Sequence, residues 1–69
     1  MSSIQKKFGK KVKELRKKKG LTQEDLAEKI NVDRSYMGFI ERGERNPTLD
    51  KIEKISKALN ITLSELFHF

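Results

Sequence analysis

Apolar residues recur at helical spacing along most of this chain. Ile4, Phe8, Val12 and Leu15 follow one another at steps of four, four and three residues, which places them on one face of a helix. Gly20 follows a run of lysines and provides a helix stop. No stretch alternates apolar and polar residues as a strand does, and no Asn-Gly or Asp-Gly turn is present. The pattern therefore predicts an all-α protein whose first helix covers residues 3–19.

Short capping sequences predict where the later helices begin. The segments "TQED" from residue 22 and "TLSE" from residue 62 have the form of capping boxes, in which the threonine hydroxyl accepts a free backbone N–H of the helix start. Asp33 and Thr48 can cap two further helices, and Asn31 can end a helix because asparagine tolerates the left-handed conformation. The predicted helices cover residues 23–30, 34–42, 49–59 and 63–67.

The same spacing predicts which faces of these helices are buried. No long loop or repeat interrupts the chain, so residues 1–69 are expected to form one domain around one core. The residues expected to face this core are Met37 and Ile40, then Leu49, Ile52, Ile55 and Leu59 on one side of the fourth helix, and Leu63, Leu66 and Phe67 in the last.

The second and third predicted helices are separated by only about three residues. Helices joined so closely cannot lie antiparallel, so they cross steeply and the second of the pair projects from the domain. Small Ala27 allows the two helices to approach closely, and Asn31 stands where a turn glycine is usual. This is the apolar skeleton of a helix-turn-helix over residues 23–42, formed by Leu26, Ala27, Ile30, Val32, Met37 and Ile40.

Positive charge is concentrated at one end of the chain. The net charge is +6, but residues 1–20 hold nine Lys or Arg and the single acid Glu14, whereas residues 21–69 hold seven basic and nine acidic residues. A basic segment attracts polyanions. Nucleic acid, an anionic membrane surface and a merely solvated helix face are therefore three interpretations of residues 1–20.

Several classes of protein are disfavoured by composition. The chain has no cysteine and a single histidine, His68, so neither a disulfide framework nor a metal site is expected. No apolar run approaches the roughly 18 residues of a membrane span, and no secretion signal is visible, so a cytoplasmic protein without a membrane partner is expected. No paired carboxylates, no nucleophile with its base and no phosphate-binding glycine loop are present. We therefore expect no catalytic residues, no enzyme activity, no cofactor and no small-molecule ligand.

The whole chain resembles the five-helix, lambda-repressor-like DNA-binding domain of the phage Cro and repressor type. The motif "LTQEDLA…IERGERNPTL" carries this resemblance, and "NVDRSYMGFIERGERNPTLDKI" is most similar to the controller proteins of restriction–modification systems. The resemblance implies a transcriptional regulator that binds double-stranded DNA in the major groove of a two-fold symmetric operator, as a homodimer. A phage-type repressor or antitoxin of the same fold, and a protein-interaction module that has lost DNA binding, are the alternatives.

The resemblance implies base-reading roles for the start of the third helix, residues 34–36. The guanidinium of Arg34 can donate two parallel hydrogen bonds to O6 and N7 of guanine. Ser35 can bond a base or a phosphate, or can serve only to start the helix. Tyr36 can contact a thymine methyl or a phosphate, or can lie partly in the core. In the controller-like pattern Arg45 also contacts DNA, the alternative being a free charge in a loop.

Other roles implied by the resemblance concern phosphates and the fold. Gln23 corresponds to a glutamine that grips a phosphate, while Arg42 and Asn46 are further phosphate candidates. Arg16 and Glu41 stand where the family keeps an internal ion pair, so we expect them to be structural.

Gly38 and Phe39 depart from the pattern of relatives, many of which place polar base-reading residues there. Readout is then confined to the first turn of the third helix, or Phe39 contacts a thymine methyl, or Phe39 packs against the domain.

The segment "ITLSELFHF" is unusually apolar for a chain end. Relatives dimerise through this region, although the same residues can instead complete the core of the monomer. The candidate interface residues are Ile61, Leu63, Phe67 and Phe69.

Overall fold

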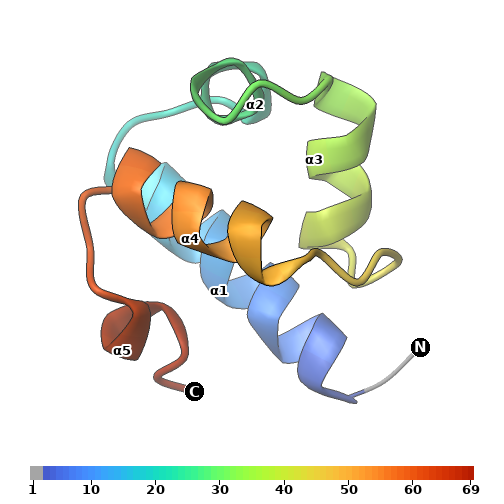
Figure 1. Cartoon of the computed structure of the whole chain (residues 1–69), viewed down its shortest axis with the longest axis vertical. Helices are drawn as coiled ribbons and strands as arrows, with labels where there is room; N and C mark the ends of the chain where they lie inside the picture. Colours follow the sequence, from blue (N-terminus) through green and yellow to red (C-terminus); the bar gives the residue numbers. More distant parts are fainter. Residues whose placement is uncertain (1–2) are drawn as a thin grey trace.

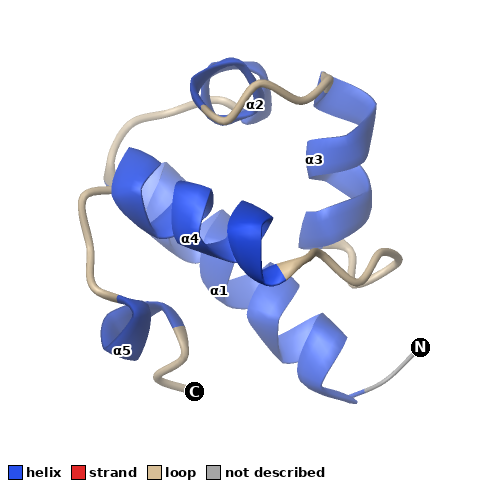
Figure 2. Cartoon of the chain, in the orientation of Figure 1, coloured by secondary structure: helices blue, strands red, loops and turns tan. Residues whose placement is uncertain are grey.

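The computed structural model describes residues 3–69, which form five helices joined by short loops (Figures 1 and 2). Each helix begins at the residue predicted from the sequence and ends one residue earlier than predicted, and no strand is present within residues 3–69. No helix in this range is both long and apolar enough to cross a membrane. The helices are α1 (Ser3–Lys18), α2 (Gln23–Lys29), α3 (Arg34–Glu41), α4 (Leu49–Ala58) and α5 (Leu63–Leu66).

Side-chain caps begin every helix from α2 to α5. The hydroxyl of Thr22 accepts the backbone N–H of Asp25 at 3.0 Å, and the Asp25 carboxylate accepts the backbone N–H of Thr22 at 2.8 Å. Thr62 and Glu65 form the same reciprocal pair, so both predicted capping boxes are confirmed. The backbone N–H groups of the two threonines lower the pKa of the Asp25 and Glu65 carboxyls. The capping residues are Thr22, Asp33, Thr48 and Thr62.

The connections between helices use left-handed backbone conformations. Asn31 has a φ of 58°, which confirms the predicted stop between α2 and α3. Asn60, for which no role was predicted, ends α4 in the same way with a φ of 55°. Tight turns of this kind keep the loops short, so the directions of neighbouring helices are set locally.

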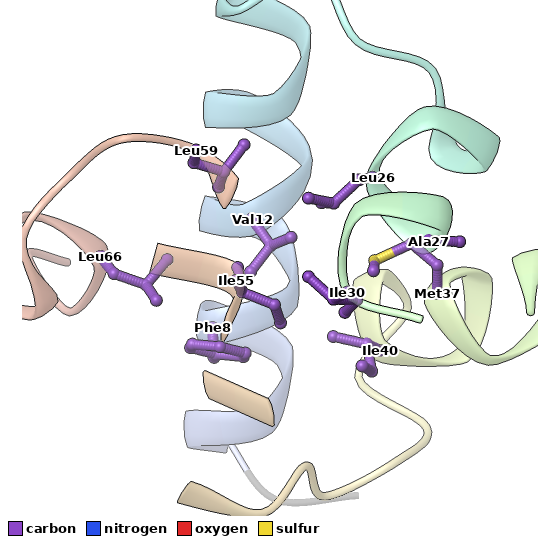
Figure 3. Packing of buried hydrophobic residues seen from close by; sticks show 10 residues of the cluster. All are labelled: Phe8, Val12, Leu26, Ala27, Ile30, Met37, Ile40, Ile55, Leu59 and Leu66. Atoms are coloured by element: carbon purple, nitrogen blue, oxygen red, sulfur yellow. The ribbon is translucent and has the colours of Figure 1, made fainter. Parts of the chain in front are cut away.

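One apolar core receives side chains from all five helices (Figure 3). α3 packs against α1 and α2, α4 packs against α2, and α5 packs against α1 and α4. Leu26, Met37 and Ile40 are among the fully buried residues, in agreement with the helix-turn-helix skeleton. The buried cluster consists of Phe8, Val12, Leu26, Ala27, Ile30, Met37, Ile40, Ile55, Leu59 and Leu66.

The apolar stripes extend beyond the core at several helix starts, so some predicted core residues are exposed. The prediction that Leu49 faces inward is wrong, because its side chain is 83% exposed. Leu49 is the first residue of α4, and burial along this helix becomes complete only at Ile55. Ile4 near the start of α1 and Leu63 at the start of α5 are also exposed, and Leu66 is the fully buried residue of α5.

α1 lies unusually close to the end of α3. Gly9 is buried, and a Cβ atom added to it would lie 2.3 Å from the carbonyl oxygen of Ile40 and 2.7 Å from that of Glu41. Only a residue without a side chain fits at this contact. The close approach brings the last turn of α1 beside α2 and α3, where the ion pair described below is formed.

Candidate nucleic-acid interface

A shallow hollow lies on the outer side of α3, where this helix faces the start of α2. We call it the α3 hollow. Four of its residues were predicted to contact DNA: Gln23 begins α2, Arg34 and Ser35 begin α3, and Arg42 caps the end of α3. The α3 hollow is lined by Gln23, Arg34, Ser35, Gly38, Phe39 and Arg42.

Arg34 and Ser35 occupy the first turn of α3 and are exposed. Asp33 fixes this turn, because its carboxylate accepts the backbone N–H of Tyr36 at 2.8 Å. The cap defines where the helix begins, and it therefore also defines the direction in which the side chains of the first turn project. The arrangement gives an exposed guanidinium beside an exposed hydroxyl at the N-terminal end of a projecting helix.

A buried ion pair lies behind the α3 hollow. Nε of Arg16 donates to Oε2 of Glu41 at 2.7 Å, and Nη2 of Arg16 donates to Oε1 at 3.1 Å. The two side chains are only 8% and 1% exposed, and Nη1 of Arg16 donates to the carbonyl of Leu21 at 2.7 Å. Within residues 3–69 no buried side-chain nitrogen or oxygen lacks a partner. The ion pair implied by the resemblance is therefore present, and it ties α1 to α3.

Gln23 connects this ion pair to the surface. Its amide Nε2 donates to Oε1 of Glu41 at 3.0 Å, so the Glu41 carboxylate accepts hydrogen bonds from both Arg16 and Gln23. A carboxylate accepts only, which fixes the amide with its nitrogen toward Glu41. The amide nitrogen carries a second hydrogen, which is the group of Gln23 able to donate to a phosphate oxygen.

The ring of Phe39 is in contact with two guanidinium groups. Cζ of Arg42 is 5.1 Å from the ring centroid, and Cζ of Arg45 is 5.4 Å from it. Nε of Arg42 also donates to the Glu44 carboxylate at 3.0 Å. The two Cζ-to-centroid distances, 5.1 and 5.4 Å, are typical of cation–π contacts. Phe39 therefore packs neither in the core nor as an isolated exposed ring, and two cationic side chains are gathered around it.

Three of the predicted DNA-contacting residues, Tyr36, Arg45 and Asn46, lie outside the α3 hollow. Tyr36 is half-buried and packs against the core, as in the alternative considered for it. Asn46 lines a separate apolar groove between the starts of α1 and α4 and the end of α5. The residues of this apolar groove are Ile4, Gln5, Phe8, Asn46, Pro47, Ile52 and Phe67.

Exposed apolar side chains continue from the apolar groove over α5. The ring centroid of Phe67 lies 5.2 Å from that of Phe8 and 6.0 Å from that of Phe69. Phe69 and Leu63 remain 49% and 47% exposed, whereas Ile61 is half-buried against the core. Three of the four residues suggested for a dimer interface are thus accessible. Phe67 serves both the monomer and this surface.

Three features of the structure were not predicted from the sequence: the close packing at Gly9, the contacts of the two arginines with Phe39, and the hydrogen bond from Gln23 to Glu41. One signal was available, since Phe39 and Arg42 are three residues apart and side chains at that spacing are neighbours on a helix. The other contacts join residues far apart in the sequence or in loops. No local pattern distinguishes them.

Comparison with known proteins fits this geometry. The family model described as helix-turn-helix matches residues 12–66, which include the whole of α2 and α3. The chain belongs to the helix-turn-helix family. Relatives of this helix-turn-helix protein include the control protein C.MunI of a Mycoplasma species, which is 53% identical over 97% of this chain and 92% of its own length.

Two further relatives of this helix-turn-helix protein are control or controller proteins. The control protein C.BamHI of Bacillus amyloliquefaciens is 48% identical over 90% of this chain and 78% of its own length. The crystal structure of the restriction–modification controller protein C.AhdI of Aeromonas hydrophila is 48% identical, with a TM-score of 0.90, and the match covers 94% of this chain and 98% of that one. The helix-turn-helix fold and the likeness to controller proteins are thereby confirmed.

Proposed function

We propose that this protein is a transcriptional regulator that binds a two-fold symmetric operator in double-stranded DNA as a homodimer, in the role of a restriction–modification controller protein. The observation that carries the proposal is the α3 hollow, in which Arg34, Ser35 and Arg42 meet Gln23 on the exposed side of a helix-turn-helix. The similarity to controller proteins supports the same conclusion. The proposal contains no catalytic step.

In the proposed complex the N-terminal end of α3 enters the major groove. Arg34 reads a guanine, with Ser35 and Tyr36 beside it, and Arg45 reaches a base from the loop that follows α3. Gln23 and Arg42 bind phosphates and so fix the register of the helix without reading sequence. Asn46, the third phosphate candidate, lines the apolar groove and not the α3 hollow.

The test is to select bound sequences from random duplex DNA and then to measure the affinity of the preferred sequence against salt concentration. We expect a two-fold symmetric consensus whose log affinity falls with log salt at a slope of about −0.9 per phosphate neutralised. Arg34→Ala is expected to relax one position in each half-site, with a loss of about 1–3 kcal/mol of discrimination per contact.

Arg34→Lys is the matched control, because lysine retains the charge but cannot donate two parallel hydrogen bonds. It should keep the salt dependence and lose the base preference. An unchanged consensus in Arg34→Ala would make this arginine a phosphate contact. Recovery of no consensus from the unsubstituted protein would overturn the regulator proposal and favour a protein-interaction module.

The dimer is proposed to form through the exposed apolar residues of α5 and the chain end. Leu63→Glu tests this interface. An acidic residue is favourable at the first position of a helix, so the monomer should tolerate it. In a two-fold interface, however, each protomer would bury one unpaired carboxylate. The dissociation constant from sedimentation equilibrium should rise by about tenfold or more. Ser64→Glu places the same charge one residue further along α5 and should change it little; equal effects of the two substitutions would argue against this interface.

A further inference from the structure

We propose that Gly38 and Phe39 are positioning residues for the DNA-binding arginines. Gly38 leaves the space that the Arg42 guanidinium occupies, and the Phe39 ring holds the guanidinium groups of Arg42 and Arg45 in the orientation used for DNA. The inference rests on the proposed function and deepens it, because it assigns a role to the two residues at which this chain departs from the polar pattern of many relatives.

Three contacts define the position of the Arg42 guanidinium. Its Cζ lies over the Phe39 ring, 5.1 Å from the ring centroid, and its Nε donates a hydrogen bond to the Glu44 carboxylate at 3.0 Å. A Cβ atom on Gly38 would lie 3.1 Å from Nη1, so this end of the guanidinium lies directly over the glycine. With Nε engaged by Glu44, the Nη nitrogens are the donors left for a phosphate oxygen at the α3 hollow.

The presence of glycine at position 38 is not explained by the stability of the fold. Glycine within a helix lowers stability relative to alanine. Gly38 lies in the middle of α3 and, unlike Gly9, it faces no neighbouring backbone; the nearest atoms to an added Cβ all belong to Arg42. A side chain here would stabilise the helix and displace the guanidinium. The space above Gly38 therefore serves Arg42.

Stacking on Phe39 also reduces the cost of ordering two long side chains when DNA binds. An exposed arginine that is free in solution loses rotamer freedom on binding, and prior ordering removes part of that loss. One ring holds both Arg42 and Arg45, so substitution of Phe39 should affect both contacts together. A leucine at this position keeps the apolar bulk but lacks the aromatic face that attracts a cation.

The test is a cycle of Phe39→Leu measured in the unsubstituted protein and in the Arg42→Ala, Arg45→Ala background. We expect Phe39→Leu to weaken operator binding by about two- to tenfold in the first and to have no effect in the second. Equal losses in both backgrounds would overturn the proposal, because they would show that the ring acts on DNA without the arginines. Phe39→Tyr, which retains an aromatic face, should bind like the unsubstituted protein.

A second measurement does not depend on DNA. The Nε–Hε groups of Arg42 and Arg45 are observed by NMR in the free protein, where heteronuclear relaxation should report ordered side chains that become mobile in Phe39→Leu. Gly38→Ala should raise the melting temperature, shift the Arg42 signal and weaken operator binding about two- to tenfold. Unchanged arginine mobility would overturn the positioning role. Ordered arginines in a protein that selects no DNA consensus would instead overturn the proposed function alone.

Discussion

Replacement of Glu41 by alanine is expected to destabilise the protein by about 3–5 kcal/mol, because it leaves the buried Arg16 guanidinium without its counter-ion. The Glu41 carboxylate is nearly fully buried and accepts hydrogen bonds from Arg16 and Gln23. A domain of this size has a total stability of only about 3–10 kcal/mol. The midpoint of urea unfolding followed by circular dichroism should therefore fall steeply, and DNA binding should be lost with the fold.

The matched control replaces both partners, as Arg16→Met with Glu41→Leu. Apolar residues of similar volume remove the buried charges together, so most of the stability should return. If the double variant is as unstable as Glu41→Ala, the side-chain shape at this contact matters more than the charge. Without this control, loss of DNA binding in Arg16→Ala would wrongly suggest that Arg16 contacts DNA.

Gly9→Ala is expected to lower the stability by about 1–3 kcal/mol despite the better helix propensity of alanine. The added methyl would meet the carbonyl oxygens of Ile40 and Glu41, which belong to the backbone of α3 and cannot rotate away. α1 must then move away from α3. The melting temperature should fall by about 5–20 °C, given about 4–8 °C per kcal/mol for a domain of this size.

Gly38→Ala is the control for this prediction, because it makes the same change inside a helix but meets only an exposed guanidinium. The two substitutions should shift the melting temperature in opposite directions. A Gly9→Ala variant that melts within a degree or two of the unsubstituted protein would contradict the close contact between α1 and α3.

Helix starts were predictable from this sequence because their signals are local. Thr22, Asp33, Thr48 and Thr62 each bond a backbone N–H three residues further along, so the pattern and the structure involve the same few residues. The helix-turn-helix skeleton was predictable for the same reason, since the short Asn31 turn fixes the crossing of two adjacent helices.

Which apolar residues are buried, and which side chains meet at the candidate site, depends on parts of the chain that are distant in sequence. Leu49 matches the apolar stripe of α4, yet it is exposed at the start of that helix. Nothing in the sequence of α1 indicates that the backbone of α3 lies beside Gly9. The resemblance implies roles for Arg34 and Ser35, but only the structure shows that Gln23 and Arg42 lie beside them. Their roles on DNA stay predictions.

The four local caps have a consequence for timing. Each of these helices is started by contacts within three residues, and the loops between helices are short, so little loop-closure entropy opposes folding. Helical domains dominated by local contacts fold in about microseconds to milliseconds. Folding should therefore add little delay after the chain has been synthesised. If the protein acts as the proposed dimer, the delay before it occupies DNA is then set by how long two protomers take to accumulate and meet.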